Sequence, residues 1–313
     1  MRIVTLEEHV SFQELSISKP TAAAQHMQAK LADITGERLS SMRATGIAMQ
    51  VLSVENTDVY ALPDSEAPAF ATKYNDLLAE KMKDHRESFT AFALLPMTTP
   101  AAAADELERT VKTHGFQGAM IKGTILGEFL DAPKFAPVFE RAQQLNVPLY
   151  IHPGVPPQAV IDAYYSNVGD TTGPNEAIAC YGWGWHSETA IHILRLFAAG
   201  IFDKYPDLKI IIGHMGEMLP MMWTRMNGIF KQGKRSLIET FKAQLFITTS
   251  GIFTQPQLQL AIDTIGIDNI LFSIDYPFST NQMGIDFLHN IQLPAEQIAK
   301  IAHGNADRLL RLK

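Results

Sequence analysis

The chain has 313 residues, of which 46% are hydrophobic and 19% are charged, and its formal net charge is −7. This composition is ordinary for a globular protein and excludes a disordered or fibrous chain. No basic run is long enough to bind a phosphate backbone, so we expect no nucleic-acid partner.

Cysteine usage and hydropathy predict where the protein resides. The single cysteine, Cys180, allows no intramolecular disulfide, which is typical of a reducing compartment. Acidic residues within the first ten positions, MRIVTLEEHV, stand where a signal peptide needs its apolar segment. No stretch approaches the ~18 uninterrupted apolar residues of a membrane span. We therefore expect a cytoplasmic protein that does not enter the membrane.

Short apolar or β-branched runs alternate with helical patterns along the whole chain. Several of these runs are continuously apolar, as expected for parallel strands that are buried on both faces. The predicted strands are Arg2–Leu6, Met49–Val54, Phe89–Leu94, Gly118–Ile121, Pro148–Ile151, Lys209–Gly213, Leu245–Thr248 and Ile270–Ile274.

Helical segments lie between these runs. Ala104, Leu107 and Val111 mark an apolar face in one of them. Repeated strand–helix alternation predicts a parallel sheet, and eight strands favour a closed (β/α)8 TIM barrel over an open sheet. Barrels of this length often form one unit, so residues 1–313 are predicted to be a single domain. The helical segments include Ala67–Arg86, Ala101–His114, Ala132–Leu145 and Ser187–Phe202.

Two connections exceed the ordinary length for a barrel. Residues 7–48 follow the first strand, and residues 153–186 follow the fifth and are rich in proline and aromatic residues. Long loops in compact domains are often lids or binding loops. Both predicted loop insertions lie on the face where barrel enzymes place their chemistry.

Metal-ligand residue types end four of the predicted strands. Because residues i and i+2 of a strand face the same side, Glu7 and His9 point into the barrel mouth while Glu8 points away. The first and last strands of a closed barrel are neighbours, so Asp275 is expected beside them. A lone histidine at a strand end is usually structural, but four such ends together predict a metal site. The remaining members are His152, His214 and Glu217.

At these residues the chain resembles the amidohydrolase superfamily, and within it the metal-dependent decarboxylase branch of γ-resorcylate and 2,3-dihydroxybenzoate decarboxylases. Many hydrolases of the superfamily begin with H-x-H on the first strand, whereas E-x-H in this chain resembles the decarboxylases. The matching stretches are LEEHV (6–10), YNDLLAE (74–80), LLPMTTP (94–100), GFQGAMIKG (115–123), VPLYIHPG (147–154), IIGHMGEMLP (211–220), SIDYPF (273–278) and GNADRLL (304–310).

The resemblance implies one divalent ion, Zn²⁺ or Mn²⁺, and a homo-oligomer, either a dimer or a tetramer. Its implied ligands are Glu7, His9, His152 and Asp275. The implied catalytic residues are Asp275, His214 and Glu217. Phe278 is implied to pack against the substrate ring.

Three further residues are candidates with alternatives. His186 lies in the aromatic loop after the fifth strand and can reach a substrate. Arg225 is a candidate for the substrate carboxylate, but it follows Trp223 by two residues, where the family commonly places an arginine directly after the tryptophan. One residue turns a helical side chain by about 100°. Lys122 ends the fourth strand, where binuclear members of the superfamily carry a carboxylated lysine; a structural or substrate-contacting lysine is the alternative.

These residues predict a metal-dependent, non-oxidative decarboxylase of a hydroxylated aromatic or related cyclic carboxylic acid. Asp275 is expected to protonate the ring carbon before CO2 leaves, which avoids a high-energy aryl anion, and His214, oriented by Glu217, is expected to tune that proton. A hydrolase using metal-activated water, with Asp275 as base, is the main alternative. A non-catalytic barrel that only binds a ligand is the third.

Overall fold

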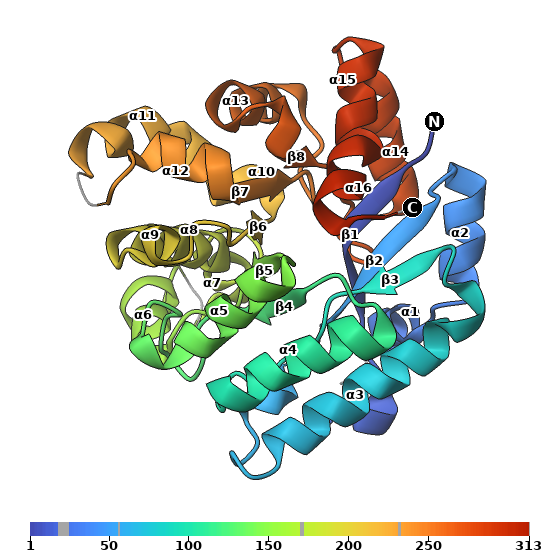
Figure 1. Cartoon of the computed structure of the whole chain (residues 1–313), viewed down its shortest axis with the longest axis horizontal. Helices are drawn as coiled ribbons and strands as arrows, with labels where there is room; N and C mark the ends of the chain where they lie inside the picture. The colour runs from blue at the N-terminus through green and yellow to red at the C-terminus, as the bar shows by residue number, and fades with distance from the viewer. Residues whose placement is uncertain (18–24, 56, 170–171, 231–232, 313) are drawn as a thin grey trace.

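A ring of parallel strands lies at the centre of the molecule, with helices around it (Figure 1). The computed structural model describes residues 1–17, 25–55, 57–169, 172–230 and 233–312. Within these ranges the strands are β1 (Val4–Val10), β2 (Met49–Val54), β3 (Phe89–Ala91), β4 (Ala119–Lys122), β5 (Leu149–His152), β6 (Ile210–Ile212), β7 (Leu245–Thr248) and β8 (Ile270–Leu271).

Hydrogen bonds group these strands into two sheets, with the orders β1-β2-β3 and β4-β5-β6-β7-β8. Isolated parallel bridges join the two sheets at both seams, Ala93 with Ala119 and Glu8 with Tyr276. At the second seam the His9 N–H donates to the Tyr276 carbonyl oxygen at 2.7 Å. The strands therefore follow one another around a ring, and the predicted (β/α)8 barrel is confirmed.

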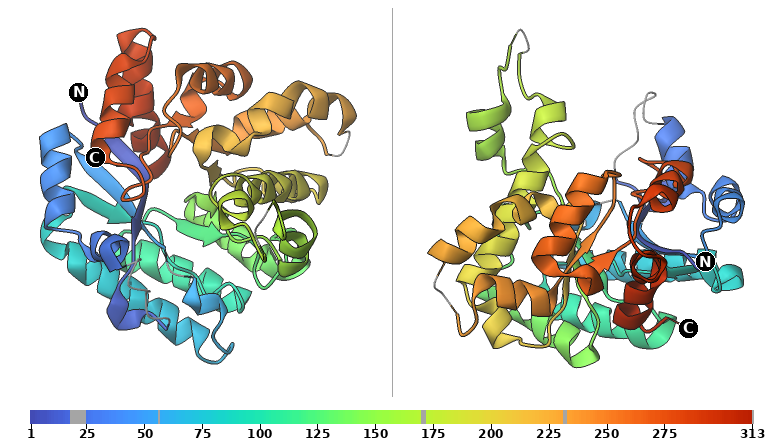
Figure 2. Two further views of the ribbon diagram at one scale, coloured as in Figure 1. Left: turned by 180° about the vertical axis from the view of Figure 1, so that it is seen from behind. Right: turned by 90° about the horizontal axis from the view of Figure 1, so that it is seen from above.

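The larger helices lie around the outside of the ring (Figures 1 and 2), and they bury apolar side chains on their inner sides. In α4, for example, Ala104 and Leu107 are buried, as the apolar spacing predicted. The larger helices are α1 (Gln25–Ala32), α2 (Glu37–Thr45), α3 (Ala67–Met82), α4 (Pro100–His114), α5 (Ala136–Leu145), α8 (Gly184–Ala198), α11 (Leu219–Ile229), α12 (Leu237–Gln244), α13 (Gln255–Ile265) and α14 (Asn281–Asn290). Shorter ones are α6 (Gln158–Val160), α7 (Glu176–Ala179), α9 (Ile201–Lys204), α10 (His214–Glu217), α15 (Ala295–Ala299) and α16 (Asn305–Leu310).

Two layers of apolar side chains hold the barrel together. One layer fills its interior with residues such as Val4, Val51 and Tyr150, and Leu310 of α16 packs against the same cluster. The other layer lies between strands and helices, where neighbouring strand residues such as Ile151 pack. Because α16 covers one end of the interior, the chemistry must lie at the other end, where the strands finish.

The two long connections that were predicted as loops contain helices. Strand β1 continues to Val10, so Glu7 and His9 lie within it, and residues 7–48 also contain α1 and α2. Residues 153–186 contain α6, α7 and the start of α8, and this segment projects from one end of the barrel (Figure 2).

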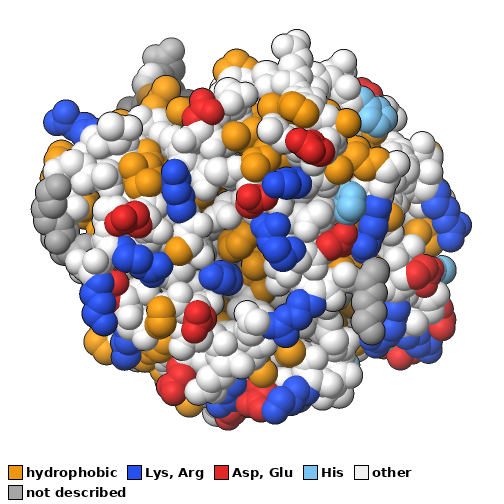
Figure 3. All heavy atoms as spheres, turned by 45° about the horizontal axis from the view of Figure 1, so that its top comes forward, with side chains coloured by type: hydrophobic (Ala, Val, Ile, Leu, Met, Phe, Trp, Pro, Cys, Tyr) orange, Lys and Arg blue, Asp and Glu red, His pale blue; other side chains and the backbone are white. Residues whose placement is uncertain are grey.

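The surface carries mixed charge, and basic and acidic side chains are interspersed on the face drawn in Figure 3. Among the described residues, no helix combines the length and apolar character needed to cross a bilayer.

Candidate active site

Glu7 is buried inside the barrel mouth, and its two carboxylate oxygens have different surroundings. The Oε2 atom accepts hydrogen bonds from the hydroxyls of Tyr150 and Ser250, and from Thr248 Oγ1 at 3.3 Å. A Cβ atom at Gly213 would lie 2.7 Å from Oε2, so only glycine leaves room for this carboxylate. The hydroxyls fix one oxygen of Glu7 and direct the other, Oε1, toward the centre of the site.

Two imidazoles face Glu7 Oε1 with the nitrogens that ligate metals. The Nδ1–H of His152 donates to the Pro153 carbonyl oxygen at 2.7 Å, which leaves Nε2 toward the site. His9 Nδ1 lies 3.2 Å from both Ser53 Oγ and Glu55 Oε2, so its Nε2 also faces inward. Such partners on the outer nitrogen hold a ligating histidine in the required tautomer and orientation.

Asp275 comes close to these groups from the loop after β8. Its Oδ1 lies 3.2 Å from His9 Nε2, and its Oδ2 lies 3.8 Å from His214 Nε2. Burial raises the pKa of Asp275, but the nearby imidazoles of His214 and His9 outweigh burial and hold the pKa below its ordinary value. Asp275 is therefore ionised beside two imidazoles.

The residues fit a divalent ion. Glu7 Oε1 lies 3.1 Å from His152 Nε2 without hydrogen-bond alignment, and within the described residues Glu7 Oε1 and His9 Nε2 are buried without any hydrogen-bond partner. The ligand atoms of Glu7, His9 and His152 all lie within 4.8 Å of one another. Unsatisfied buried polar atoms are costly, and a cation would satisfy them. Two imidazoles with carboxylates suit Zn²⁺ or Mn²⁺.

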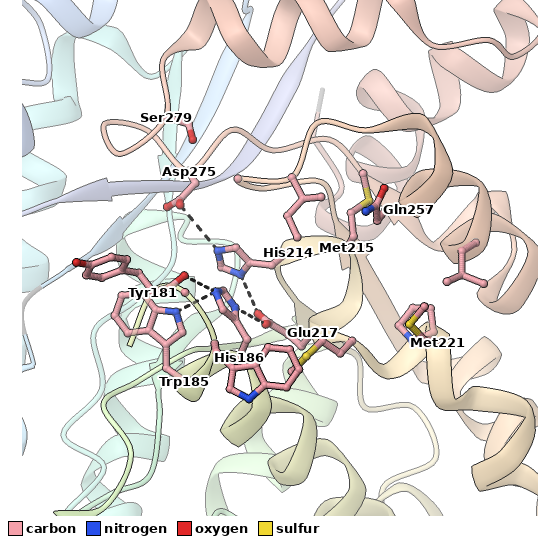
Figure 4. Close-up of a pocket in the computed structure, with 17 residues that line it drawn as sticks. Tyr181, Trp185, His186, His214, Met215, Glu217, Met221, Gln257, Asp275 and Ser279 are labelled. Carbon is pink, nitrogen blue, oxygen red and sulfur yellow. Dashed lines mark hydrogen bonds and ion pairs between the residues drawn. The ribbon is translucent and has the colours of Figure 1, made fainter. Parts of the chain in front are cut away.

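A second cluster adjoins this one. In it, Glu217 lies between two imidazoles (Figure 4). Its Oε1 lies 2.8 Å from His214 Nδ1, and its Oε2 lies 2.7 Å from His186 Nδ1. Burial lowers the pKa of His214, but the charges of Glu217 and Glu7 outweigh burial and raise it well above its ordinary value. A proton therefore rests on His214, next to Asp275.

The backbone that presents this cluster is unusual. Five consecutive residues, from His214 to Met218, have positive φ angles between 47° and 90°. L-residues rarely form such a left-handed turn, which costs about 1–2 kcal/mol for each non-glycine residue. The His214 N–H donates to Ser250 Oγ at 3.0 Å, and this bond helps to hold the turn. Strain of this kind is concentrated at functional sites.

Two cavities meet at His214 and Asp275. The first, of about 300 Å³, is lined by His9, Glu55, His152, Tyr181, Trp185, His214, Asp275 and Phe278. The second, of about 520 Å³, is lined by His186, Glu217, Gln257, Ser279 and apolar residues that include Met215, Met218 and Met221. The first has aromatic walls beside the candidate metal ligands, so it suits a planar ring.

The three residues that were predicted to contact the substrate lie in three different places in the structure. Phe278 lines the smaller cavity, and its ring centroid lies 5.7 Å from that of His9. His186 lines the larger cavity and pairs with Glu217. Arg225 is exposed on α11 and lines neither cavity, so its contact with a substrate stays a prediction.

Several residues of the site were missed by sequence reasoning. One of them is Glu55, which forms an ion pair with Lys122. An ammonium group that is paired in this way, and that lines neither cavity, agrees with a structural role for Lys122. Tyr150 precedes His152 by two residues on β5 and so shares its face. That spacing could have identified Tyr150.

Comparisons with known proteins show the family of the chain. The amidohydrolase family model matches residues 24–312. A γ-resorcylate decarboxylase from Polaromonas sp. is 36% identical over 99% of this chain and 98% of its own.

Two solved structures are similar over the same extent. The dihydroxybenzoic acid decarboxylase from Polaromonas sp. JS666, with bound manganese and the inhibitor 2-nitroresorcinol, is 34% identical with a TM-score of 0.89, and the match covers 99% of this chain and 97% of that one. The 5-carboxyvanillate decarboxylase from Sphingomonas paucimobilis is 28% identical with a TM-score of 0.89, over 100% of this chain and 99% of that one. The chain therefore belongs to the amidohydrolase family.

Proposed function

We propose that this protein is a metal-dependent, non-oxidative decarboxylase of a hydroxylated aromatic carboxylic acid. The observation that carries the proposal is the convergence of Glu7 Oε1, His9 Nε2 and His152 Nε2 beside Asp275 and His214. Full-length similarity to aromatic acid decarboxylases supports the same chemistry.

Glu7, His9, His152 and Asp275 would hold one divalent ion, either Mn²⁺, as in the Polaromonas structure, or Zn²⁺. When bound, the ion supplies positive charge that orients the anionic oxygens of the substrate. The hydroxyl groups around Glu7 Oε2 keep that carboxylate in position, and the Pro153 carbonyl does the same for His152.

The substrate ring binds in the smaller cavity, where Phe278, Tyr181 and Trp185 provide aromatic surface. This placement brings the ring carbon that bears the carboxylate toward Asp275. A flat, apolar substrate with a few polar substituents matches this lining.

The proton travels from His214 to Asp275 and then to the ring. The O–H bond of protonated Asp275 breaks as a pair of ring π electrons forms the new C–H bond, and this protonation before CO2 loss avoids an aryl anion. The electron pair of the bond to the carboxylate carbon then returns to the ring as CO2 leaves. Glu217 stabilises the imidazolium form of His214 and so maintains the supply of protons. General acid help of this kind contributes ~10²–10⁴ in rate.

A substrate panel tests the proposal. Protein loaded with Mn²⁺ or Zn²⁺ is supplied with hydroxybenzoates and, in parallel, with lactones, esters and amides. Release of CO2 and appearance of the phenol are expected from at least one hydroxybenzoate. Hydrolysis of the esters or amides, with no CO2 from any aryl acid, would instead establish the hydrolase alternative.

The chain is also proposed to act as one domain and as a homo-oligomer in the cytoplasm. The barrel uses residues from β1 to α16, which supports a single domain. Trp183, Met221 and Ile229 expose large apolar surface that a second copy would cover. Light scattering is expected to give the mass of a dimer or a tetramer.

A further inference from the structure

Glu55 follows β2 directly and lines the smaller cavity, where it contacts Nδ1 of His9 while Asp275 contacts Nε2 of the same ring. Its side chain is 32% exposed, whereas the side chain of its partner Lys122 is only 7% exposed and does not line the cavity. A molecule in the cavity therefore meets the carboxylate and not the ammonium group behind it.

The two oxygens of this carboxylate are used unequally. Oε2 pairs with Lys122 Nζ and lies 3.2 Å from His9 Nδ1. Oε1 has no hydrogen-bond partner within the described ranges, which omit the neighbouring residue 56. The ion pair with the Lys122 ammonium group favours the ionised form of Glu55, and an ionised carboxylate accepts hydrogen bonds and donates none.

We infer that Glu55 is a substrate-selecting residue that accepts a hydrogen bond from a second donor substituent on the aromatic ring. This inference rests on the proposed function and specifies its substrate class. The ring carries a hydroxyl or amino group on the edge that faces β2, in addition to the hydroxyl beside its carboxylate.

A second carboxylate or a methoxy group at that position meets an acceptor with no proton to share. A carboxylate is also repelled by the charge of Glu55. Relatives of this chain include a dihydroxybenzoic acid decarboxylase and a 5-carboxyvanillate decarboxylase. Glu55 assigns this chain to substrates with a second hydroxyl or amino donor and separates it from substrates with a second carboxylate.

The test compares matched substrates on matched variants, all loaded with Mn²⁺ and checked for metal content. Each dihydroxybenzoate isomer and its aminohydroxy counterpart is compared with the analogue in which the second substituent is a methoxy group. Because hydrogen bonds to charged groups contribute about 1.5–3 kcal/mol, the wild type is expected to prefer the best donor substrate about 10–100-fold in kcat/KM.

Two variants remove the acceptor charge. Glu55→Gln retains size, and the double variant Glu55→Met with Lys122→Met removes both charges, so that no unpaired charge stays buried. Both are expected to reduce the preference, the double variant to about one. Ser53→Ala is the matched control, because Ser53 also contacts His9 Nδ1 but does not line the cavity. Any loss of activity that acts through His9 lowers kcat/KM for both substrates equally, so it cancels in the ratio of the two values.

Binding gives an answer that does not depend on turnover. The dissociation constants of the corresponding phenols, measured by quenching of tryptophan fluorescence, are expected to show the same preference and the same loss in the double variant. A preference that is equal in the wild type and the double variant, or no preference in the wild type, overturns the inference. If no aryl acid releases CO2 but the phenols discriminate as described, the proposed function fails and the donor subsite stands.

Discussion

Glu8 supports Asp275 from the neighbouring strand by holding the backbone on both sides of it. Glu8 Oε1 accepts a hydrogen bond from the Ile274 N–H at 3.1 Å, and Oε2 accepts one from the Tyr276 N–H at 3.0 Å. Asp275 itself has a φ angle of 73°, which is unfavourable for a residue with a side chain. The buried carboxylate of Glu8 therefore stabilises the turn that aims Asp275 into the site.

Replacing Glu8 by Gln is expected to weaken this support. The amide NH2 group cannot accept a hydrogen bond, so one backbone N–H loses its partner, and the free energy of unfolding falls by about 1–3 kcal/mol. Urea denaturation of the metal-free protein at pH 5 measures this difference. An unchanged free energy would show that the two N–H groups find other partners.

The difference in the free energy of unfolding between the wild type and Glu8→Gln is also expected to depend on pH. Burial raises the pKa of Glu8 from 4.5 to about 8, so the folded protein favours the protonated carboxyl. The stability that this preference contributes is present at low pH and is lost as pH rises from about 4.5 through 8. Gln does not titrate, so the two stabilities should approach each other at pH 8.5. A constant difference between pH 5 and pH 8.5 would contradict the raised pKa.

Tyr150→Phe is expected to weaken metal binding without unfolding the barrel. The phenol of Tyr150 donates to Glu7 Oε2, and its removal frees the carboxylate to rotate away from His152. Loss of such an outer partner typically costs 10–100-fold in metal affinity. Competition with a metal chelator measures the affinity, and Tyr165→Phe, outside the site on the projecting segment, is the control. Equal affinities in all three proteins would exclude this role.

Glu217→Gln is expected to lower turnover and to shift its pH dependence. The charge of Glu217 raises the pKa of His214, so removing it lowers that pKa and depletes the protonated imidazole as pH rises. The alkaline limb of the kcat profile should therefore move to lower pH, and kcat at pH 7.5 should fall by about 10²-fold or more. His186→Gln replaces the other imidazole partner of Glu217 and should move the alkaline limb of the kcat profile less. A profile that keeps its wild-type position would refute the proton supply through His214.

The sequence predicted those parts of the site that follow from regular geometry. Strand periodicity placed Glu7 and His9 on one face, and barrel closure brought Asp275 to them. The left-handed turn that begins at His214 could not be predicted from local sequence patterns. The surrounding structure holds these residues in a backbone conformation that they would not prefer by themselves. The Glu55–Lys122 pair joins two strands 67 positions apart, so no local pattern indicates it.

The position of one metal ion tests the central claim most directly. Crystals soaked in Mn²⁺ are examined by anomalous scattering, which locates the ion without reference to activity. One peak in contact with Glu7, His9, His152 and Asp275 is the predicted result. A peak among His186, His214 and Glu217, which form the other candidate cluster in the described residues, or no peak at either cluster, would contradict it.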